Sequence, residues 1–464
     1  MVFTSSIFLF AFLPAFLLLY LISPRSLKSL TITVSSFVFY GWWRPDFVLL
    51  MLSSSMVDYL LAGRIVSDRD NGRGNGKRWL ALSCIANLGL LGYFKYSNFG
   101  IDTFRTLMLA LGYESSFHWE QVVLPVGISF YTFQTLSYTI DVYRGEVKPA
   151  RNWIDFLCYV SMFPQLVAGP IVRYAVVEHE LQTRQHTWHG FYQGILYLQS
   201  GLAKKVLIAD MLAPVADTAF AAEHLQAGDA WLGIFAYALQ IYFDFSGYSD
   251  MAIGLGLMIG FHFPINFDSP YRSQSITEFW RRWHMSLSTW LRDYLYISLG
   301  GNRRGPLRTY VNLSLTMVLG GFWHGASWNF IAWGGWQGFW LVIERLCGKR
   351  PWYGPAPALV RVAITFVLAL FGWVLFRAAD LSHALAFSGD MLLLRCGEAT
   401  ALDLGLLQWT ALAAGSAVVW LAPTTQALVA RASPWWAIPL QALFVLAILH
   451  LNFQSDVPFL YFQF

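Results

Sequence analysis

The stretch Gly320-Gly-Phe-Trp-His-Gly-Ala-Ser-Trp-Asn329 places a histidine, His324, inside an apolar segment that runs from about 310 to 345. A titratable side chain is costly at membrane depth and usually faces a bundle interior or a water-filled cavity. Gly321 and Gly325 have the spacing that lets two helices approach closely. The same spacing recurs later in the segment, at Gly334 and Gly338. The segment therefore predicts tightly packed membrane helices around a polar group.

The composition of the whole chain agrees with that segment. Of the 464 residues, 12% are charged and 56% are hydrophobic, whereas an ordinary soluble domain carries roughly 25% charged residues. Further apolar segments lie near 1–22, 30–43, 47–62, 79–96, 122–142, 153–172, 191–208, 229–261, 358–376, 405–422 and 436–453. Since a span needs about 20 apolar residues, we expect an all-α, polytopic membrane protein. It would have roughly ten to twelve transmembrane helices in a single membrane-embedded domain over residues 1–464.

Basic residues between the apolar segments predict the orientation of the chain. Arg25 and Lys28 follow the first segment, and the loop at 63–78 is rich in arginine and lysine. Because cytoplasmic loops carry an excess of these residues, both places indicate a periplasmic N-terminus. The first segment lacks the features of a cleaved signal peptide, so we expect it to be an uncleaved span. The small net charge of +4 fits a lipid bilayer as partner rather than nucleic acid.

The sequence contains no recognisable metal or disulfide motif. Its ten histidines form no HExxH motif and its four cysteines form no CxxC pair. We therefore expect no bound metal or cofactor, and free cysteines that pack as small buried apolar residues. The cysteines are Cys84, Cys158, Cys347 and Cys396.

The segment 268–308 is the most basic part of the chain, with seven arginines. Ser275 and Glu278 fit the S-x-x-E capping box with which a helix begins. The residues after Glu278 are spaced to form one amphipathic helix at the membrane surface or packed into the membrane domain. Its apolar face would hold Trp280, Trp283, His284, Leu287 and Leu291.

Three arginines of this segment are candidates for binding a substrate. Arg281, Arg282 and Arg292 lie off the apolar face and could attract a phosphorylated donor such as a nucleotide-bearing thioester. The alternative is that most of the seven arginines only orient the protein in the membrane.

Two histidines are the candidates for chemistry. A neutral histidine can take a proton from a hydroxyl or a thiol near pH 7. The alternative for each is a buried histidine that only donates a hydrogen bond between helices. His284 lies beside the cytoplasmic arginines and His324 lies deep in the membrane, so the pair suggests a path between the two sides.

Three further polar residues are predicted to support the site. Asp244 and Asp250 lie in an apolar stretch, where a carboxylate needs a partner or becomes protonated. They could orient a histidine, pair with an arginine or fix helix packing. Asn329 follows His324 by five residues, so on a regular helix it points away, and a direct role would need a helix break at the glycines.

Five motifs stand out: Pro125-Val-Gly-Ile-Ser-Phe-Tyr-Thr-Phe-Gln134, Gly169-Pro-Ile-Val-Arg173, Tyr242-Phe-Asp-Phe-Ser-Gly-Tyr-Ser-Asp-Met-Ala-Ile-Gly254, Phe279-Trp-Arg-Arg-Trp-His-Met-Ser-Leu-Ser288 and Phe322-Trp-His-Gly325. From about 122 to 345 the sequence thereby resembles the membrane-bound O-acyltransferase superfamily, and most of all its bacterial branch that acts in alginate O-acetylation. The resemblance implies a ring of transmembrane helices, with short re-entrant or amphipathic helices, around a thin centre that a tunnel crosses.

The resemblance also implies a function. His324 falls on the presumed catalytic histidine of the family and His284 on its second functional histidine. The chain would be a bacterial inner-membrane enzyme that takes an acetyl group from a cytoplasmic thioester, with acetyl-CoA as the expected donor. It would pass this group across the membrane for O-acetylation of an exported exopolysaccharide, either alginate or cellulose. A periplasmic or membrane-anchored acetyltransferase of a polysaccharide export complex would complete the transfer.

Other functions remain open from the residues. D-alanyl transfer towards teichoic acid is carried out by similar proteins. A transporter or flippase would move an acyl carrier or a polymer without chemistry, and Asp244 and Asp250 would then line its pathway. A purely structural subunit would depend on the packing glycines and not on the histidines.

Overall fold

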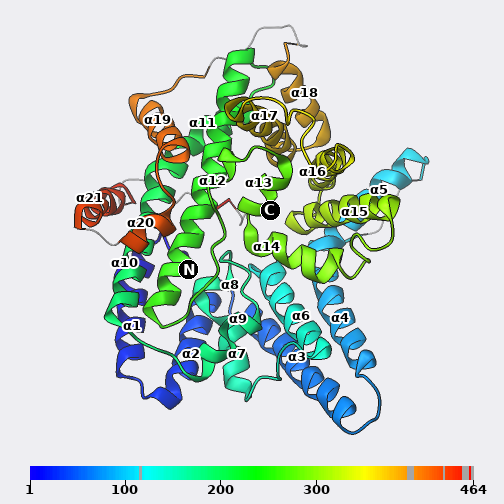
Figure 1. Cartoon of the computed structure of the whole chain (residues 1–464), viewed down its shortest axis with the longest axis vertical. Coiled ribbons are helices and arrows are strands. Elements are labelled where there is room, and N and C mark those ends of the chain that lie inside the picture. The colour runs from blue at the N-terminus through cyan, green and yellow to red at the C-terminus, as the bar shows by residue number, and fades with distance from the viewer. Residues whose placement is uncertain (114–117, 394–401, 432–433, 452–458, 461–464) are drawn as a thin grey trace. The chain divides into compact units, whose positions relative to one another are not determined.

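The computed structural model describes residues 1–113, 118–393, 402–431, 434–451 and 459–460, and the regular elements in them are helices (Figure 1). The expected all-α class is therefore confirmed for the described residues. The chain divides into two compact units, 1–187 with 259–263 and 188–258 with 264–464. Every candidate site residue lies in the second unit.

The first unit is a set of mostly apolar helices. Its α-helices are α1 (Leu13–Ile22), α2 (Lys28–Gly41), α3 (Asp46–Asp70), α4 (Lys77–Leu91), α5 (Ser97–Ala110), α6 (Ile128–Arg144), α7 (Trp153–Ser161), α8 (Phe163–Leu166) and α9 (Tyr174–Gln182). Because α3 continues to Asp70, the basic loop expected at 63–78 is shorter than predicted. The Asp68 carboxylate accepts hydrogen bonds from Arg78 at 3.1 Å and from the Trp79 indole at 2.8 Å, which holds the next helix against the end of α3.

The longest helix among the described residues, α12 (Ala227–Met258), lies in the second unit. Its α-helices are α10 (Trp188–Lys204), α11 (Asp210–Ala221), α12 (Ala227–Met258), α13 (Ile276–Arg282), α14 (Met285–Trp290), α15 (Pro306–His324), α16 (Trp328–Leu346), α17 (Ala358–Arg377), α18 (Leu381–Met391), α19 (Leu406–Trp420), α20 (Thr425–Arg431) and α21 (Pro434–Leu451). One π-helical turn, Lys205–Ala209, joins α10 to α11.

Glycines let α10 and α12 pack with their backbones in contact. A Cβ atom on Gly194 would lie 2.6 Å from the carbonyl oxygen of Gly254, and one on Gly247 would lie 2.7 Å from that of Gly201. No side chain fits at these distances, so the glycine pairs fix how α12 lies along α10. This contact positions the middle of α12, which carries Asp244 and Asp250.

The apolar segment expected at about 310–345 forms two helices that pack on each other. Helix α15 ends at His324, and α16 begins after Ser327, whose hydroxyl accepts a hydrogen bond from the Asn329 amide at 3.1 Å. A Cβ atom on Gly321 would collide with the carbonyl oxygen of Phe330. The close approach expected from the glycine spacing is therefore confirmed.

Few helices meet the length and composition of a full membrane span. Among the described residues, α3 and α17 do so, and α19 with α20 would add a third if this pair, bent by 73°, is one span. Shorter apolar helices are Phe8–Ile22 and Trp435–Leu451. The number of ten to twelve spans stays a prediction.

The cysteines differ in their burial. Cys158 is fully buried, Cys84 is half-buried and Cys347 is exposed, and all three are free thiols. The expectation of buried cysteines is therefore wrong for Cys347, which follows the last turn of α16 where the chain leaves the helix. Cys396 lies outside the described residues.

Candidate active site

The helix that begins after Ser275 is interrupted at His284. The Ser275 hydroxyl accepts a hydrogen bond from the Glu278 amide at 3.0 Å, which confirms the predicted cap. Helix α13 then ends at Arg282, and His284 has φ +42°, a left-handed conformation that is uncommon for residues other than glycine. The single amphipathic helix expected as far as Leu291 is therefore wrong, and a second short helix, α14, starts after His284.

Asn266 explains both the break and the orientation of the His284 ring. Its main-chain oxygen accepts from the Met285 amide at 2.9 Å, and its side-chain oxygen accepts from the Ser286 amide at 3.2 Å. An amide N–H only donates, so the side-chain atom that receives it is the oxygen. This oxygen also lies 3.1 Å from Nδ1 of His284. Nδ1 therefore carries the proton, and in the neutral ring Nε2 carries the lone pair.

His284 and His324 lie next to each other. Their ring centroids are 6.3 Å apart and both side chains are buried, with exposed fractions of 0% and 6%. The two histidines come from segments 40 residues apart in the sequence, so only the tertiary structure brings them together. The arrangement allows one reacting group to contact both rings.

Helix α13, which ends just before His284, contacts α16, which packs on the helix that ends at His324. The Glu344 carboxylate accepts from the amides of Ile276 at 2.6 Å and Thr277 at 2.9 Å, at the positive N-terminus of α13. One turn further on, the Trp280 indole donates to the Gln337 side chain at 3.1 Å.

Aromatic rings surround the pair. The Phe245 ring, on α12, lies 4.7 Å from that of His284, and the rings of Trp333 and Phe376 lie 5.1 and 5.4 Å from that of His324. Among the described residues, His284 belongs to none of the helices that could span a bilayer. Its burial lowers its pKa to about 3, because an apolar environment disfavours the charged ring. His284 is thus neutral at pH 7, as a proton acceptor must be.

Asp244 pairs with a lysine that the sequence interpretation did not single out. Its carboxylate lies 2.6 Å from Nζ of Lys205, which lies 2.5 Å from the carboxylate of Asp210. The main-chain amide of Leu460 donates to the second Asp244 oxygen at 3.0 Å. The neighbouring Phe459 ring lies 4.6 Å from that of Tyr248 on α12. Phe459 and Leu460 are therefore bound to the middle of α12.

Asp250 belongs to a different polar cluster. Its carboxylate accepts from Nζ of Lys204 at 2.7 Å and from the Thr425 hydroxyl at 2.8 Å. Lys204 also donates to the Thr425 hydroxyl at 2.7 Å. The structure thus brings neither Asp244 nor Asp250 to a histidine or an arginine, and both are paired with lysines.

Asn329 lies just after the helix break. Its side-chain amide donates to the carbonyl oxygen of Ala378 at 2.6 Å, which ties the first turn of α16 to the end of α17. The break that a direct role requires is present between α15 and α16, but the hydrogen bond that Asn329 makes is to the main chain.

The three candidate arginines differ in their surroundings. Arg282 pairs with Glu278 at 2.9 Å and Asp268 at 3.5 Å, and Arg292 pairs with Asp293 at 2.6 Å. Arg281 is exposed. Arg281 is thus the member of this set that is best placed to meet an anion from solution.

Three residues of the site were missed. Lys204 and Lys205 lie in an apolar segment, and the reasoning that singled out Asp244 and Asp250 there would also have selected them, because a buried lysine needs an acidic partner. Asn266 lies between helices in a loop that carries no spacing signal. Among the described residues, no group of three histidine, cysteine or acidic side chains could hold a metal ion.

His284 and His324 lie side by side, buried among aromatic rings, in an apolar helical protein. Residues 94–376 match the family model of MBOAT, the membrane-bound O-acyltransferase family, and the chain belongs to this family. The resemblance described above is therefore confirmed.

The relatives identify the reaction class. The chain is 46% identical to a probable alginate O-acetylase of Pseudomonas putida over the full length of both proteins. It is 51% identical to a probable alginate O-acetylase of Pseudomonas aeruginosa, over 83% of this chain and 73% of that protein. It is also 37% identical to a peptidoglycan O-acetyltransferase of Helicobacter pylori, over 83% and 78%. The chain is a membrane O-acetyltransferase.

Proposed function

We propose that this protein takes an acetyl group from a cytoplasmic thioester, acetyl-CoA, and passes it across the bacterial inner membrane for O-acetylation of an exported exopolysaccharide. The observation that carries the proposal is the buried pair of His284 and His324, with ring centroids 6.3 Å apart. Alginate is the first candidate polymer because the names of the most similar relatives cited above contain it.

In this proposal His324 is the general base. It takes the proton of the accepting hydroxyl, and the hydroxyl oxygen bonds to the carbonyl carbon of the thioester. The carbon–sulfur bond breaks, and the leaving thiolate takes up the proton from His324, so that an acetyl ester and a free thiol are the products. His284, with Nε2 as acceptor, orients the donor. The aromatic surroundings keep water from hydrolysing the thioester.

The remaining candidate residues act around this pair. Arg281 attracts the phosphate groups of the donor, with Arg282 and Arg292 adding to the positive field at the cytoplasmic side. Asp244, Asp250 and Asn329 hold the helices that carry the site.

The proposal includes an arrangement in the membrane. The N-terminus lies in the periplasm, and the shorter apolar helices add to the spans, so that ten to twelve of them form a ring around a thin, tunnelled centre. A periplasmic or membrane-anchored acetyltransferase accepts the acetyl group and completes the transfer to the polymer.

The test is polymer acetylation in cells that carry His324→Ala or His284→Ala at normal protein levels. We expect loss of acetylation with His324→Ala, by about 100-fold or more for removal of a general base, and a smaller loss with His284→Ala. Unchanged acetylation with His324→Ala would exclude the role of this residue.

A second experiment separates acetyl transfer from transport. Purified protein in detergent receives labelled acetyl-CoA and the partner acetyltransferase, and in a parallel sample a labelled D-alanyl thioester. Label transferred from acetyl-CoA without a membrane gradient supports the proposal. Transfer of D-alanine alone, or of neither group, would contradict it.

A further inference from the structure

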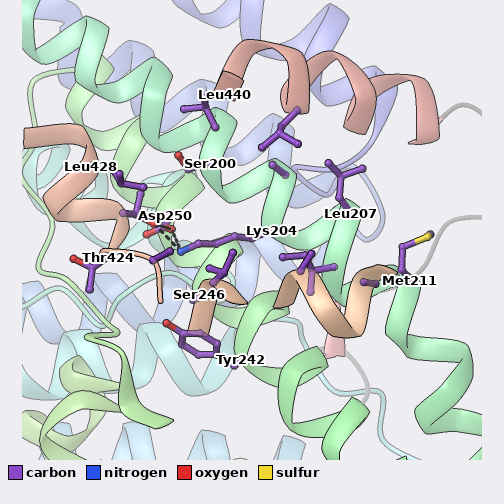
Figure 2. Close-up of a pocket in the computed structure, with 18 of the residues that line it drawn as sticks. Ser200, Lys204, Leu207, Met211, Tyr242, Ser246, Asp250, Thr424, Leu428 and Leu440 are labelled. Atoms are coloured by element: carbon purple, nitrogen blue, oxygen red, sulfur yellow. Dashed lines mark hydrogen bonds and ion pairs between the residues drawn. The ribbon is translucent and has the colours of Figure 1, made fainter. Parts of the chain in front are cut away.

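A cavity of about 460 Å³ lies in the second unit, and neither His284 nor His324 is among the residues that line it. Its walls come from α10, α11, α12, α19, α20 and α21 and from the loop that holds Phe267 and Ser269 (Figure 2). Its volume falls within the range of sites for small ligands, about 300–1,000 Å³. The acetyl transfer described above leaves this cavity without a role.

Most of the lining is aliphatic, and part of it faces outward. Leu407 on α19 is 62% exposed, and Leu443 and Leu446 on α21 are 45% and 52% exposed. Helices α19 and α20 together have the length and composition of one broken span. In a membrane protein the exposed aliphatic side chains of such a segment face lipid. The cavity is therefore accessible to a hydrocarbon chain from the bilayer.

One part of the cavity is polar. Figure 2 shows Lys204 extending towards Asp250. The Thr425 hydroxyl completes the cluster, because it donates to Asp250 and accepts from Lys204. A lysine ammonium group has three N–H donors, and Asp250 and Thr425 account for two of them. The Ser246 hydroxyl also lines the cavity, is 2% exposed and has no hydrogen-bond partner in the part of the chain that the structure describes. A buried hydroxyl without a partner is unfavourable. The Ser246 hydroxyl and the third N–H of Lys204 can both donate, so the site favours a ligand atom that accepts a hydrogen bond.

The charges of the cluster limit the kind of acceptor. Lys204 and Asp250 form a neutral pair at 2.7 Å. A carboxylate or phosphate added beside them would leave one unbalanced negative charge in an apolar cavity, which is costly. A neutral ester carbonyl accepts a hydrogen bond without that cost. We propose that this cavity binds the ester-linked acyl chain of a glycerolipid, with the ester carbonyl held by Ser246 and Lys204 and the chain lying among the aliphatic residues of α19 and α21.

Aromatic rings connect one wall of the cavity to His284. Phe267 lines the cavity, and its ring lies 6.5 Å from that of His284. The ring of Tyr242, which also lines the cavity, lies 5.9 Å from that of Phe267. Lipid binding at this cavity does not depend on the acetyl-transfer proposal.

The experiment uses the purified full-length chain in phosphatidylglycerol nanodiscs. The probe is a monoacylglycerol whose acyl chain ends in a photoreactive diazirine, and the matched probe is the free fatty acid with the same chain. We expect the ester probe to label peptides of α19 and α21 that line the cavity, and the acid to label them about tenfold less, which corresponds to 1.4 kcal/mol. Labelling confined to peptides away from the cavity would overturn the proposal, and so would equal labelling by the acid.

Two variants that fill the cavity test its position. Ala414→Trp fills it from α19, and Leu207→Trp fills it from the π-helical turn between α10 and α11. If one variant fails to fold, the other still tests the position. The control is Ala413→Trp, because Ala413 is exposed on the same helix and does not line the cavity. We expect about tenfold less labelling for the filled variants than for the control, each checked by its elution profile. Labelling of a folded filled variant at the level of the control would refute the site.

The polar end is tested with Ser246→Ala. This substitution removes one donor to the ester carbonyl and also removes the unpaired hydroxyl. We expect the ester probe to lose several-fold of its labelling, as for one hydrogen bond of about 1 kcal/mol, while the acid probe is unchanged. An equal loss of labelling for both probes would show that Ser246 does not distinguish the ester from the acid.

Discussion

His284 is held in an unusual backbone conformation, and Asn266 holds it there. A non-glycine residue in the left-handed region costs about 1–3 kcal/mol. Asn266 offsets this strain with its hydrogen bonds to Met285, Ser286 and the His284 ring. The same contacts fix which ring nitrogen carries the proton. In the proposed mechanism Asn266 is therefore a positioning residue.

Asn266→Ala tests this role. The His284 ring would lose the acceptor that fixes its tautomer, and we expect kcat for acetyl transfer to fall by about 10–100-fold, as for other misplaced catalytic groups. The measurement is single-turnover transfer from labelled acetyl-CoA by purified protein. Ser249→Ala is the control, since it removes only the partner of the Asn266 amide nitrogen. Equal rates for Asn266→Ala and wild type would contradict the assignment.

The buried state of His284 predicts how the stability depends on pH. Its pKa is lowered from 6.5 to about 3 in the folded protein, so between these values the unfolded state binds more protons. Stability is therefore lost as the pH falls from about 6.5 towards 3, by up to about 1.4 kcal/mol per pH unit. Chemical unfolding at about pH 5 should show wild type losing about 2 kcal/mol more than His284→Gln, relative to pH 7. Equal losses of stability in wild type and His284→Gln would show that His284 does not cause this pH dependence.

At the scale of helices, α15 and α16 depend on glycine where their backbones meet. A Cβ atom on Gly334 would collide with the carbonyl oxygen of Met317, whereas one on Gly335 would meet nothing within 4 Å. The two glycines are neighbours on one helix and differ only in the face on which they lie.

This difference gives a matched pair of substitutions. Gly334→Ala should destabilise the protein by about 1–3 kcal/mol through overpacking. Gly335→Ala should stabilise it by about 0.5–1 kcal/mol, because alanine favours the helix. Thermal unfolding of both variants in the same detergent provides the measurement. A Gly334→Ala protein as stable as Gly335→Ala would mean that the helices do not touch there.

The sequence predicted those parts of the site that depend on local spacing. The glycine spacing around His324 predicted the close approach of α15 and α16, and Ser275 with Glu278 predicted the start of α13. The break at His284 could not be predicted because its cause, Asn266, lies 18 residues earlier in a loop. The partner of Asp244 was missed for a similar reason, since Lys205 lies on another element and only the packing of α10 on α12 brings the two together.

At the scale of the second unit, Lys205 connects helices that are separate in the sequence. It pairs with Asp210 at the start of α11 and with Asp244 in the middle of α12, and all three side chains are buried. Asp244 in turn binds the amide of Leu460. Two buried carboxyl groups therefore share one ammonium group in an apolar interior.

Lys205→Met should be strongly destabilising. It leaves Asp210 and Asp244 without a cation, and the loss of one partner from a buried ion pair costs about 3–5 kcal/mol. The triple variant Lys205→Met, Asp210→Asn, Asp244→Asn should recover most of this loss, because no buried charge remains unpaired. The measurement is the free energy of unfolding in urea for wild type, the single variant and the triple variant. A triple variant less stable than the single one would argue against the ion pairs.

The hydrogen bond from Leu460 to Asp244 has a consequence for the order in which the protein is made. A ribosome translates α12 and both histidines long before it reaches Phe459 and Leu460. Until those residues emerge, an Asp244 oxygen in the middle of α12 lacks its main-chain donor. A nascent chain cut short before residue 459 would hold His284 and His324 but not this bond. Such a chain would keep a polar atom of α12 without this donor in an apolar interior, which is costly.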